Sequence, residues 1–181
     1  EFAITRHGFS PRLSLIRLQD ACSIGCLRGN FGSENECSFS SDGKYLLSGN
    51  ADRILILYSL PDIKKITTLK GHTDHVLACS LSPDAKLGLS ASADANLILW
   101  SLPSGKIINR LWGHTDVVTA CAMSSNGKFA LSASWDKTMI LWSLPDGKPI
   151  VKQRMANRVT YSCALSEDGK LALTCSANDE S

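Results

Sequence analysis

Serine, histidine and aspartate occur in this sequence in the combination that hydrolases use for nucleophilic catalysis. Two such sets lie 42 residues apart (114 − 72 = 42): His72, Ser90 and Asp94, and then His114, Ser132 and Asp136. An enzyme needs a catalytic triad only once, whereas side chains that hold a repeated unit together must recur in each unit. The repetition favours a structural role, so we expect no catalytic residues and no enzyme activity.

Histidine and cysteine also occur at spacings that metal sites use. His72, His75 and Cys79 form one candidate group, and Cys22 and Cys26 form a candidate pair. His72 already belongs to the repeated set, and Cys79 occupies a position that is cysteine in four repeats, which indicates packing. No glycine-rich segment opens a helix in the way a phosphate-binding loop requires. We therefore expect no metal and no cofactor.

The elements that position these residues follow the same 42-residue period. Trp100 and Trp142 are 42 residues apart (142 − 100 = 42), and Tyr58 aligns with them one period earlier. Within one period, four short apolar segments alternate with turn signals: VVTACAMS, KFALSAS, TMILWSL and KPIVKQR. No segment shows a sustained helical period. Each period therefore predicts one four-stranded antiparallel sheet, and the fold class is all-β.

Continuous apolar runs such as LILW and MILW predict strands that are buried on both faces. Sheets of this kind bury both faces when they stack radially, as the blades of a β-propeller do. The predicted blades cover residues 33–70, 75–112 and 117–154, with partial blades at 1–28 and 159–181. The whole chain, 1–181, is thus interpreted as one propeller region of about four blades.

These phased residues resemble the WD-repeat (WD40-type) family of β-propellers, in which Gly-His near the start and Trp near the end mark each unit. Gly71-His72 through Trp100 and Gly113-His114 through Trp142 follow the family's order. In that family the His, a strand Ser, the turn Asp and the Trp form a hydrogen-bonded network inside the blade. The resemblance implies two such networks: His72, Ser90, Asp94 and Trp100, and His114, Ser132, Asp136 and Trp142. The choice of Ser132 over Ser134 rests on strand alternation.

The departures from the family pattern are specific. Serine follows each repeated Trp or Tyr in place of Asp, Asn30 replaces one His, and Met155-Ala156 replaces one Gly-His. We expect the affected units to be held less tightly at these points. Since such propellers usually have seven or eight blades, the chain is interpreted as part of a larger ring. A homodimer that completes an eight-bladed ring, and closure of the chain alone, are the alternatives.

Partner binding is expected where the repeats differ from one another. In the family, the turn that carries the repeated Asp lies on the rim used most often for partners. The position before this Asp is Ala51, Ala93 and Ala177 in three repeats and Trp135 in the fourth. Trp135 is therefore the first candidate for partner binding, and folding down over its own blade is the alternative. His75, Tyr161 and Arg158 are the other rim candidates.

Composition narrows the class of partner. The formal net charge is +2, and the 19 Lys and Arg residues are spread along the chain, so nucleic acid is not expected. No apolar run is long enough to span a membrane. Seven cysteines, an odd number, favour reduced thiols and a cytoplasmic setting.

The predicted function is a non-catalytic scaffold that binds a protein or peptide. The alternative is a sensor or regulatory propeller domain of a larger signalling protein.

Overall fold

The computed structural model describes residues 2–6, 12–18, 20, 22–28, 37–155, 158–166 and 168–178. Every regular element in these ranges is a β-strand, and every strand pairing is antiparallel, as the sequence predicts. The strands form three four-stranded sheets, one three-stranded sheet and one two-stranded sheet. The chain is thus a series of small antiparallel sheets, each made from strands consecutive in the sequence.

Each four-stranded sheet is one blade. Blade 1 consists of β4 (Cys37–Phe39), β5 (Tyr45–Gly49), β6 (Ile54–Ser59) and β7 (Lys64–Lys70). Blade 2 consists of β8 (Val76–Leu81), β9 (Leu87–Ser92), β10 (Leu97–Ser101) and β11 (Lys106–Leu111). Blade 3 consists of β12 (Val118–Met123), β13 (Phe129–Ser134), β14 (Thr138–Ser143) and β15 (Lys148–Arg154).

Two smaller sheets flank the three blades along the chain. The first contains β1 (Phe2–Arg6), β2 (Arg12–Arg17) and β3 (Cys22–Arg28), and the second contains β16 (Arg158–Leu165) and β17 (Ala172–Asn178). By the 42-residue period, β1 to β3 align with second, third and fourth strands of a blade, and β16 and β17 with a first and second strand. Within the predicted blade boundaries, residues 1, 7–11, 19, 21, 33–36, 167 and 179–181 lie outside the described residues.

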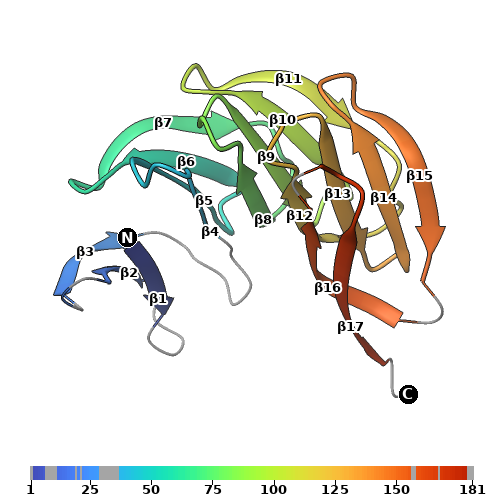
Figure 1. The fold of residues 1–181 in the computed structure, drawn as a ribbon, viewed down its shortest axis with the longest axis horizontal. Coiled ribbons are helices and arrows are strands. Elements are labelled where there is room, and N and C mark those ends of the chain that lie inside the picture. Colours follow the sequence, from blue (N-terminus) through green and yellow to red (C-terminus); the bar gives the residue numbers. More distant parts are fainter. Residues whose placement is uncertain are drawn as a thin grey trace.

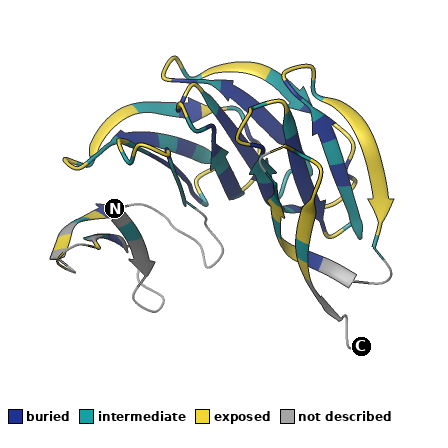
Figure 2. Ribbon diagram, viewed as in Figure 1, coloured by how far each residue is buried: buried dark blue, intermediate teal, exposed yellow. Residues whose placement is uncertain are grey.

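The blades stand side by side in an arc, with β7, β11 and β15 on its outer side (Figure 1). Their first strands are neighbours in sequence order, since β8 contacts β4 and β12, and β12 contacts β16. Burial is concentrated in the second and third strands, whereas all seven residues of β15 are exposed (Figure 2). This radial stacking of antiparallel sheets is a β-propeller arrangement.

The hydrophobic core lies between blades as much as within them. One cluster joins Leu89 and Leu99 of blade 2 to Ile140 and Trp142 of blade 3. A second joins Leu47 and Leu57 of blade 1 to Ile98 and Trp100 of blade 2, and a third joins Leu27 of β3 to Leu46 and Tyr58 of blade 1. Each sheet therefore buries its faces against its neighbours, as the apolar runs predict.

Polar contacts also link neighbouring blades at their inner strands. The Leu81 N–H donates to Ser38 Oγ at 2.9 Å, and one period later the Met123 N–H donates to Ser80 Oγ at 3.2 Å. The repeated cysteine position takes part as well, because the Cys79 thiol donates to the Leu47 carbonyl of blade 1 at 3.4 Å. These contacts position the inner strands of adjacent blades relative to each other.

Candidate functional site

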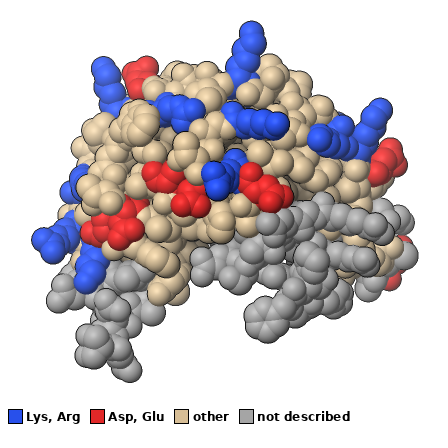
Figure 3. Space-filling model, turned by 180° about the vertical axis from the view of Figure 1, so that it is seen from behind, with Lys and Arg blue, Asp and Glu red and all other residues tan. Residues whose placement is uncertain are grey.

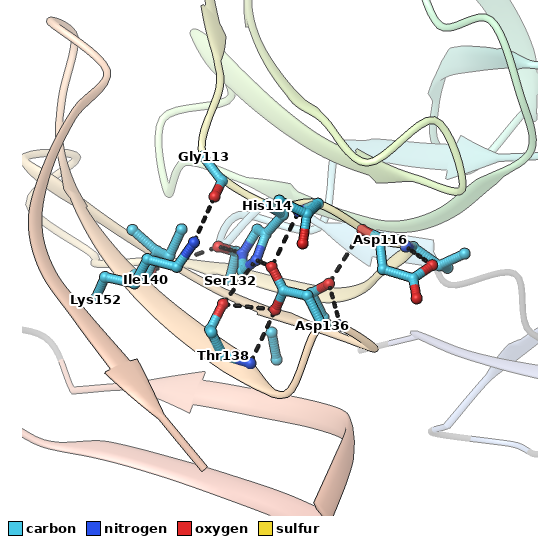
Figure 4. Close-up of polar contacts among 12 residues, drawn as sticks. Gly113, His114, Asp116, Ser132, Asp136, Thr138, Ile140 and Lys152 are labelled. Atoms are coloured by element: carbon cyan, nitrogen blue, oxygen red, sulfur yellow. Dashed lines mark hydrogen bonds and ion pairs between the residues drawn. The ribbon is translucent and has the colours of Figure 1, made fainter.

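The polar network of blade 3 joins the loop before the blade to the turn between β13 and β14 (Figure 4). His114 Nδ1 lies 2.9 Å from Asp136 Oδ2, and His114 Nε2 lies 2.8 Å from Ser132 Oγ. The Trp142 indole Nε1–H donates to the same Ser132 oxygen at 2.8 Å. His114, Ser132 and Trp142 are buried, so the four side chains form one enclosed chain of contacts.

The direction of these hydrogen bonds follows from the groups involved. An indole N–H only donates, so Ser132 accepts from Trp142 and has its own hydroxyl hydrogen available for His114 Nε2. His114 then carries its proton on Nδ1 and donates it to Asp136. Burial lowers the pKa of His114, although its hydrogen bond to the Asp136 carboxylate opposes the shift. The neutral imidazole with Nδ1–H fits this arrangement.

Asp136 is the most heavily bonded member of the network. Its Oδ2 also accepts the Thr115 N–H at 3.1 Å, and its Oδ1 accepts the Thr138 N–H at 2.8 Å and the Thr138 hydroxyl at 2.6 Å. Burial acts to raise the pKa of Asp136, but the hydrogen bonds from Thr138, His114 and Thr115 outweigh it and lower the pKa to about 2. The carboxylate therefore stays ionised and ties the turn to the loop.

A glycine is required where this loop crosses the indole ring. A Cβ placed on Gly113 would lie 2.9 Å from Trp142 Cη2, and one on Gly71 would lie 2.9 Å from Trp100 Cη2. Side chains on the outer strands hold the same two glycines from outside. Lys152 Nζ donates to the Gly113 carbonyl at 2.7 Å, and Arg110 Nη2 donates to the Gly71 carbonyl at 3.1 Å. The loop is thus fixed from both sides.

Blade 2 contains the same network one period earlier. His72 Nδ1 lies 2.8 Å from Asp94 Oδ2, and His72 Nε2 lies 2.7 Å from Ser90 Oγ, which accepts the Trp100 indole N–H at 2.8 Å. Burial acts to raise the pKa of Asp94, but hydrogen bonds from His72 and the Thr73 N–H lower it to about 2. The structure therefore brings together all eight residues that the sequence groups into two networks.

Blade 1 is built differently at the corresponding point. Its Ser48 hydroxyl accepts from the Cys37 thiol at 3.2 Å, and burial raises the pKa of Tyr58, which aligns with the Trp. Asn50 Oδ1 accepts the Asp52 and Ile54 N–H groups at 3.0 and 3.2 Å, so the turn is held by its own side chain. Asn30, which replaces the His, lies outside the described residues.

The serine hydroxyls of the two networks are not accessible to a substrate. Ser90 and Ser132 have no exposed surface, and each hydroxyl is already engaged with a His and a Trp. A nucleophile of a hydrolase must approach the scissile carbonyl. Among the described residues, no group of three His, Cys, Asp or Glu side chains is placed to hold a metal ion. His72, from the candidate metal group, instead belongs to the network of blade 2.

The rim candidates lie at the same edge as these turns. Trp135 is 41% exposed, and its N–H donates to the Val117 carbonyl at 2.9 Å, which fixes the turn to the entrance of β12. His75 is exposed, and its carbonyl accepts the Ala93 N–H in the same way in blade 2. Tyr161 is 50% exposed and lies at a register shift between Thr160 and Ser162. Arg158 begins β16, but its side chain lies outside the described part.

Several residues that contribute to the networks or to the rim are not predicted from the sequence. Thr138 hydrogen-bonds Asp136, and Lys152 and Arg110 hold the loop glycines, as described above. Trp112 is 64% exposed, more than any other Trp. The sequence does mark Trp112 as unusual, because the aligned residue one period earlier is Lys70. Asp116 and Asp74 are also not among the candidates from the sequence, and each lies at the entrance to the first strand of its blade.

The blades and their networks define a β-propeller built from repeats with a buried His, Ser, Asp and Trp. The family model described as WD domain, G-beta repeat matches residues 22–59, 63–101 and 105–143. These matches cover more than half of the chain, which therefore belongs to the WD40 repeat family. A comparison with curated proteins returned no match. In the described residues, no helix is long and apolar enough to cross a membrane.

The matched repeats are offset from the blades by one strand. The match at 105–143 begins with β11, the outer strand of blade 2, and continues through β12, β13 and β14 of blade 3. The match at 63–101 joins β7 to β8, β9 and β10 in the same manner. Each repeat therefore contributes to two neighbouring blades, and the Gly-His loop lies at the crossing between them.

Proposed function

We propose that this chain is part of a non-catalytic scaffold that binds a partner protein or peptide on the rim formed by the β13–β14 turn and the entrances of β12 and β16. The observation that carries this proposal is Trp135, a partly exposed aromatic side chain on a turn held by Val117 and Asp136. Large aromatic side chains on rigid supports supply much of the binding energy in protein interfaces. WD40 repeats generally serve as protein-interaction scaffolds.

Tyr161, His75 and Arg158 are proposed as further contributors. The Thr119 hydroxyl donates to the Thr160 carbonyl, which joins β12 to β16 directly before Tyr161. His75 belongs to the equivalent rim of blade 2. The proposed cellular setting is the cytoplasm, because the odd number of cysteines in the sequence favours reduced thiols.

Selection of random phage-displayed peptides on the protein tests this function. We expect the enriched peptides to lose binding in Trp135→Ala and Tyr161→Ala. They should keep binding in Ile150→Ala, which removes an exposed side chain from outer strand β15. Circular dichroism of each variant verifies folding. Enriched peptides that bind all three variants equally, or a selection without enrichment on the wild-type chain, would contradict binding at this rim.

We also propose that further blades cover the exposed side of blade 3, from the remainder of a larger propeller or from a second copy in an eight-bladed ring. An apolar groove of about 180 Å³ lies there, lined by Leu131, Met139, Leu141, Val151, Leu165 and Ala172. Leu171 and Leu173, beside it, are each 74% exposed. Light scattering separates the two sources, because only the second predicts a stable mass of twice 19.5 kDa.

A further inference from the structure

Asp116 lies directly beside Trp135 on the rim of blade 3. The Ser134 hydroxyl donates to the Asp116 carbonyl at 3.0 Å, and the Trp135 N–H donates to the next carbonyl, that of Val117. The Asp116 side chain is exposed, and its Oδ1 accepts the Val117 N–H at 2.7 Å. Its Oδ2 accepts no hydrogen bond from the described residues. An available carboxylate oxygen and a partly exposed indole therefore belong to neighbouring backbone segments of this rim.

Among the described side chains next to this pair, the Asp116 carboxylate is the available ionic group, and Arg158 begins β16 on the same rim with its side chain outside the described part. Lys137 follows Trp135 by two residues, but it is half-buried and already has a partner. Asp136 is committed to His114, Thr115 and Thr138. Seen from behind, many Lys and Arg side chains stand along the outer margin, and the Asp and Glu side chains across the middle have basic side chains among them (Figure 3).

Tyr161 adds a second aromatic ring to the same surface. The hydrogen bond from Thr119 to the Thr160 carbonyl joins β12 to β16 two residues after Val117, and Tyr161 follows directly. Tyr161 is half-exposed at a register shift. An exposed carboxylate and exposed aromatic rings on one rim favour a cationic partner, because ring faces attract positive charge and a carboxylate pairs with it.

On this basis we infer that the rim formed by Asp116, Trp135 and Tyr161 binds a peptide segment through an arginine or lysine side chain. The inference rests on the proposed function and specifies the chemistry of its partner. A cationic side chain with an aliphatic stem fits the surface, since the stem packs on the indole while the charged end reaches Asp116 Oδ2. An acidic segment would meet the carboxylate and be repelled.

Blade 2 supplies an internal control for this chemistry. There the Ser92 hydroxyl donates to the Asp74 carbonyl at 3.1 Å, the Ala93 N–H donates to the His75 carbonyl at 2.9 Å, and the His75 N–H donates to Asp74 Oδ1 at 2.8 Å. The backbone bonds are thus the same as in blade 3, although His75 Nε2 lies 4.0 Å from Asp74 Oδ1 where blade 3 has Val117. The indole is missing, because Ala93 stands where Trp135 stands. Asp74 is therefore expected to bind no cationic peptide.

The experiment uses two nine-residue peptides of glycine, serine and alanine that differ only at the central residue, arginine in one and the neutral isostere citrulline in the other. Binding is followed by NMR through the Trp135 indole N–H signal, assigned with Trp135→Ala. We expect the arginine peptide to bind about two- to fivefold more tightly than the citrulline peptide. Asp116→Asn should remove this preference, whereas Asp74→Asn should leave it unchanged.

A gain of binding provides an independent measurement. Ala93→Trp places an indole beside Asp74, and its new N–H signal should shift when the arginine peptide is added. Asp74→Asn in that variant should abolish the shift. Equal binding of the two peptides, or equal effects of Asp116→Asn and Asp74→Asn on the wild-type rim, would overturn the inference.

The phage selection separates this inference from the proposed function. Selected peptides that depend on Trp135 and are enriched in arginine or lysine support both. Selected peptides that depend on Trp135 but lack basic residues overturn the cationic partner and leave the rim as the binding surface. Selected peptides that bind independently of Trp135 overturn both.

Discussion

Replacement of Asp136 by asparagine is expected to destabilise the protein substantially at neutral pH. Asp136 accepts four hydrogen bonds, and its side chain is only 5% exposed. Asparagine has the same shape, but its NH₂ group would face either the donors on Thr138 or those on His114 and Thr115. The charge that strengthens all four bonds is also lost.

The magnitude follows from the pKa of about 2 that the folded protein gives Asp136, compared with the ordinary value of 3.8. A difference of this size corresponds to about 2 kcal/mol of folding free energy at neutral pH, which solvent screening at the rim reduces to about 1–2 kcal/mol. The misplaced NH₂ group adds about 1 kcal/mol. We therefore expect Asp136→Asn to cost about 2–3 kcal/mol at pH 7.

The pH dependence has a definite sign. Because the folded pKa of Asp136 lies below the unfolded one, the unfolded state takes up the proton first as the pH falls. The stabilisation is fully present above about pH 5 and is lost as the pH falls through about 4 towards 2. The difference between wild type and Asp136→Asn should therefore be largest between pH 5 and pH 7 and should fall to about half or less by about pH 2.5.

Urea unfolding followed by tryptophan fluorescence measures this difference at a series of pH values. Asp94→Asn in blade 2 should behave alike, since the pKa of Asp94 is also lowered to about 2. Asp116→Asn, an exposed replacement in the same loop, should change stability by less than about 0.5 kcal/mol. A cost of Asp136→Asn that stays constant from pH 7 to pH 2.5 would refute the assignment of the effect to the buried charge.

Three further outcomes are expected. Ser132→Ala leaves the Trp142 indole and His114 Nε2 without a partner and should cost about 2 kcal/mol by urea unfolding. Ser48→Ala should cost about 1 kcal/mol or less, because Ser48 bonds no His or Trp side chain. Similar costs of the two substitutions would contradict this reasoning. Gly113→Ala should cost about 1–3 kcal/mol by thermal unfolding, because its Cβ would overlap the Trp142 ring. Burial lowers the pKa of His114, so an NMR titration should place its midpoint below 6.5, and this His should destabilise the fold as the pH falls below about 6.5.

The strand content of the chain follows from its repeat. Once Trp100 and Trp142 set the period, each strand of blade 3 falls where the apolar segments predict, from Val118–Met123 to Lys148–Arg154. The offset between repeat and blade is less accessible, because the period is the same wherever the unit is taken to begin. The resemblance to the WD-repeat family supplies the predicted blade bounds, and in the structure β11 pairs with β10 and not with β12.

The networks are predictable in part. The spacing of His114 and Asp136 repeats that of His72 and Asp94, so these pairs can be recognised from the sequence. The serine cannot be chosen by alternation, because Ser132 and Ser134 are two residues apart and lie on the same face of β13. The structure distinguishes them by depth, since Ser132 meets Trp142, whereas Ser134 bonds the Asp116 carbonyl nearer the rim.

Other contacts depend on which outer strand passes which loop. Lys152 reaches the carbonyl of Gly113, which is 39 residues earlier, and Arg110 reaches Gly71 across the same separation. Neither the spacing nor the residue type indicates such a bond in advance. The exposure of Trp112 is similar, because the sequence shows an unusual residue at its position but not the direction in which its ring points.

The offset of repeat and blade links neighbouring blades through the chain, because the strands of one repeat belong to two blades. Because each repeat supplies the outer strand of one blade and three strands of the next, cutting the chain between two repeats separates a blade from its outer strand. An excised repeat would likewise carry an outer strand with no sheet to join. Duplication or loss of a whole repeat, by contrast, keeps every blade four-stranded, so a gene encoding such units can change its blade number without ever creating a defective blade between its ends.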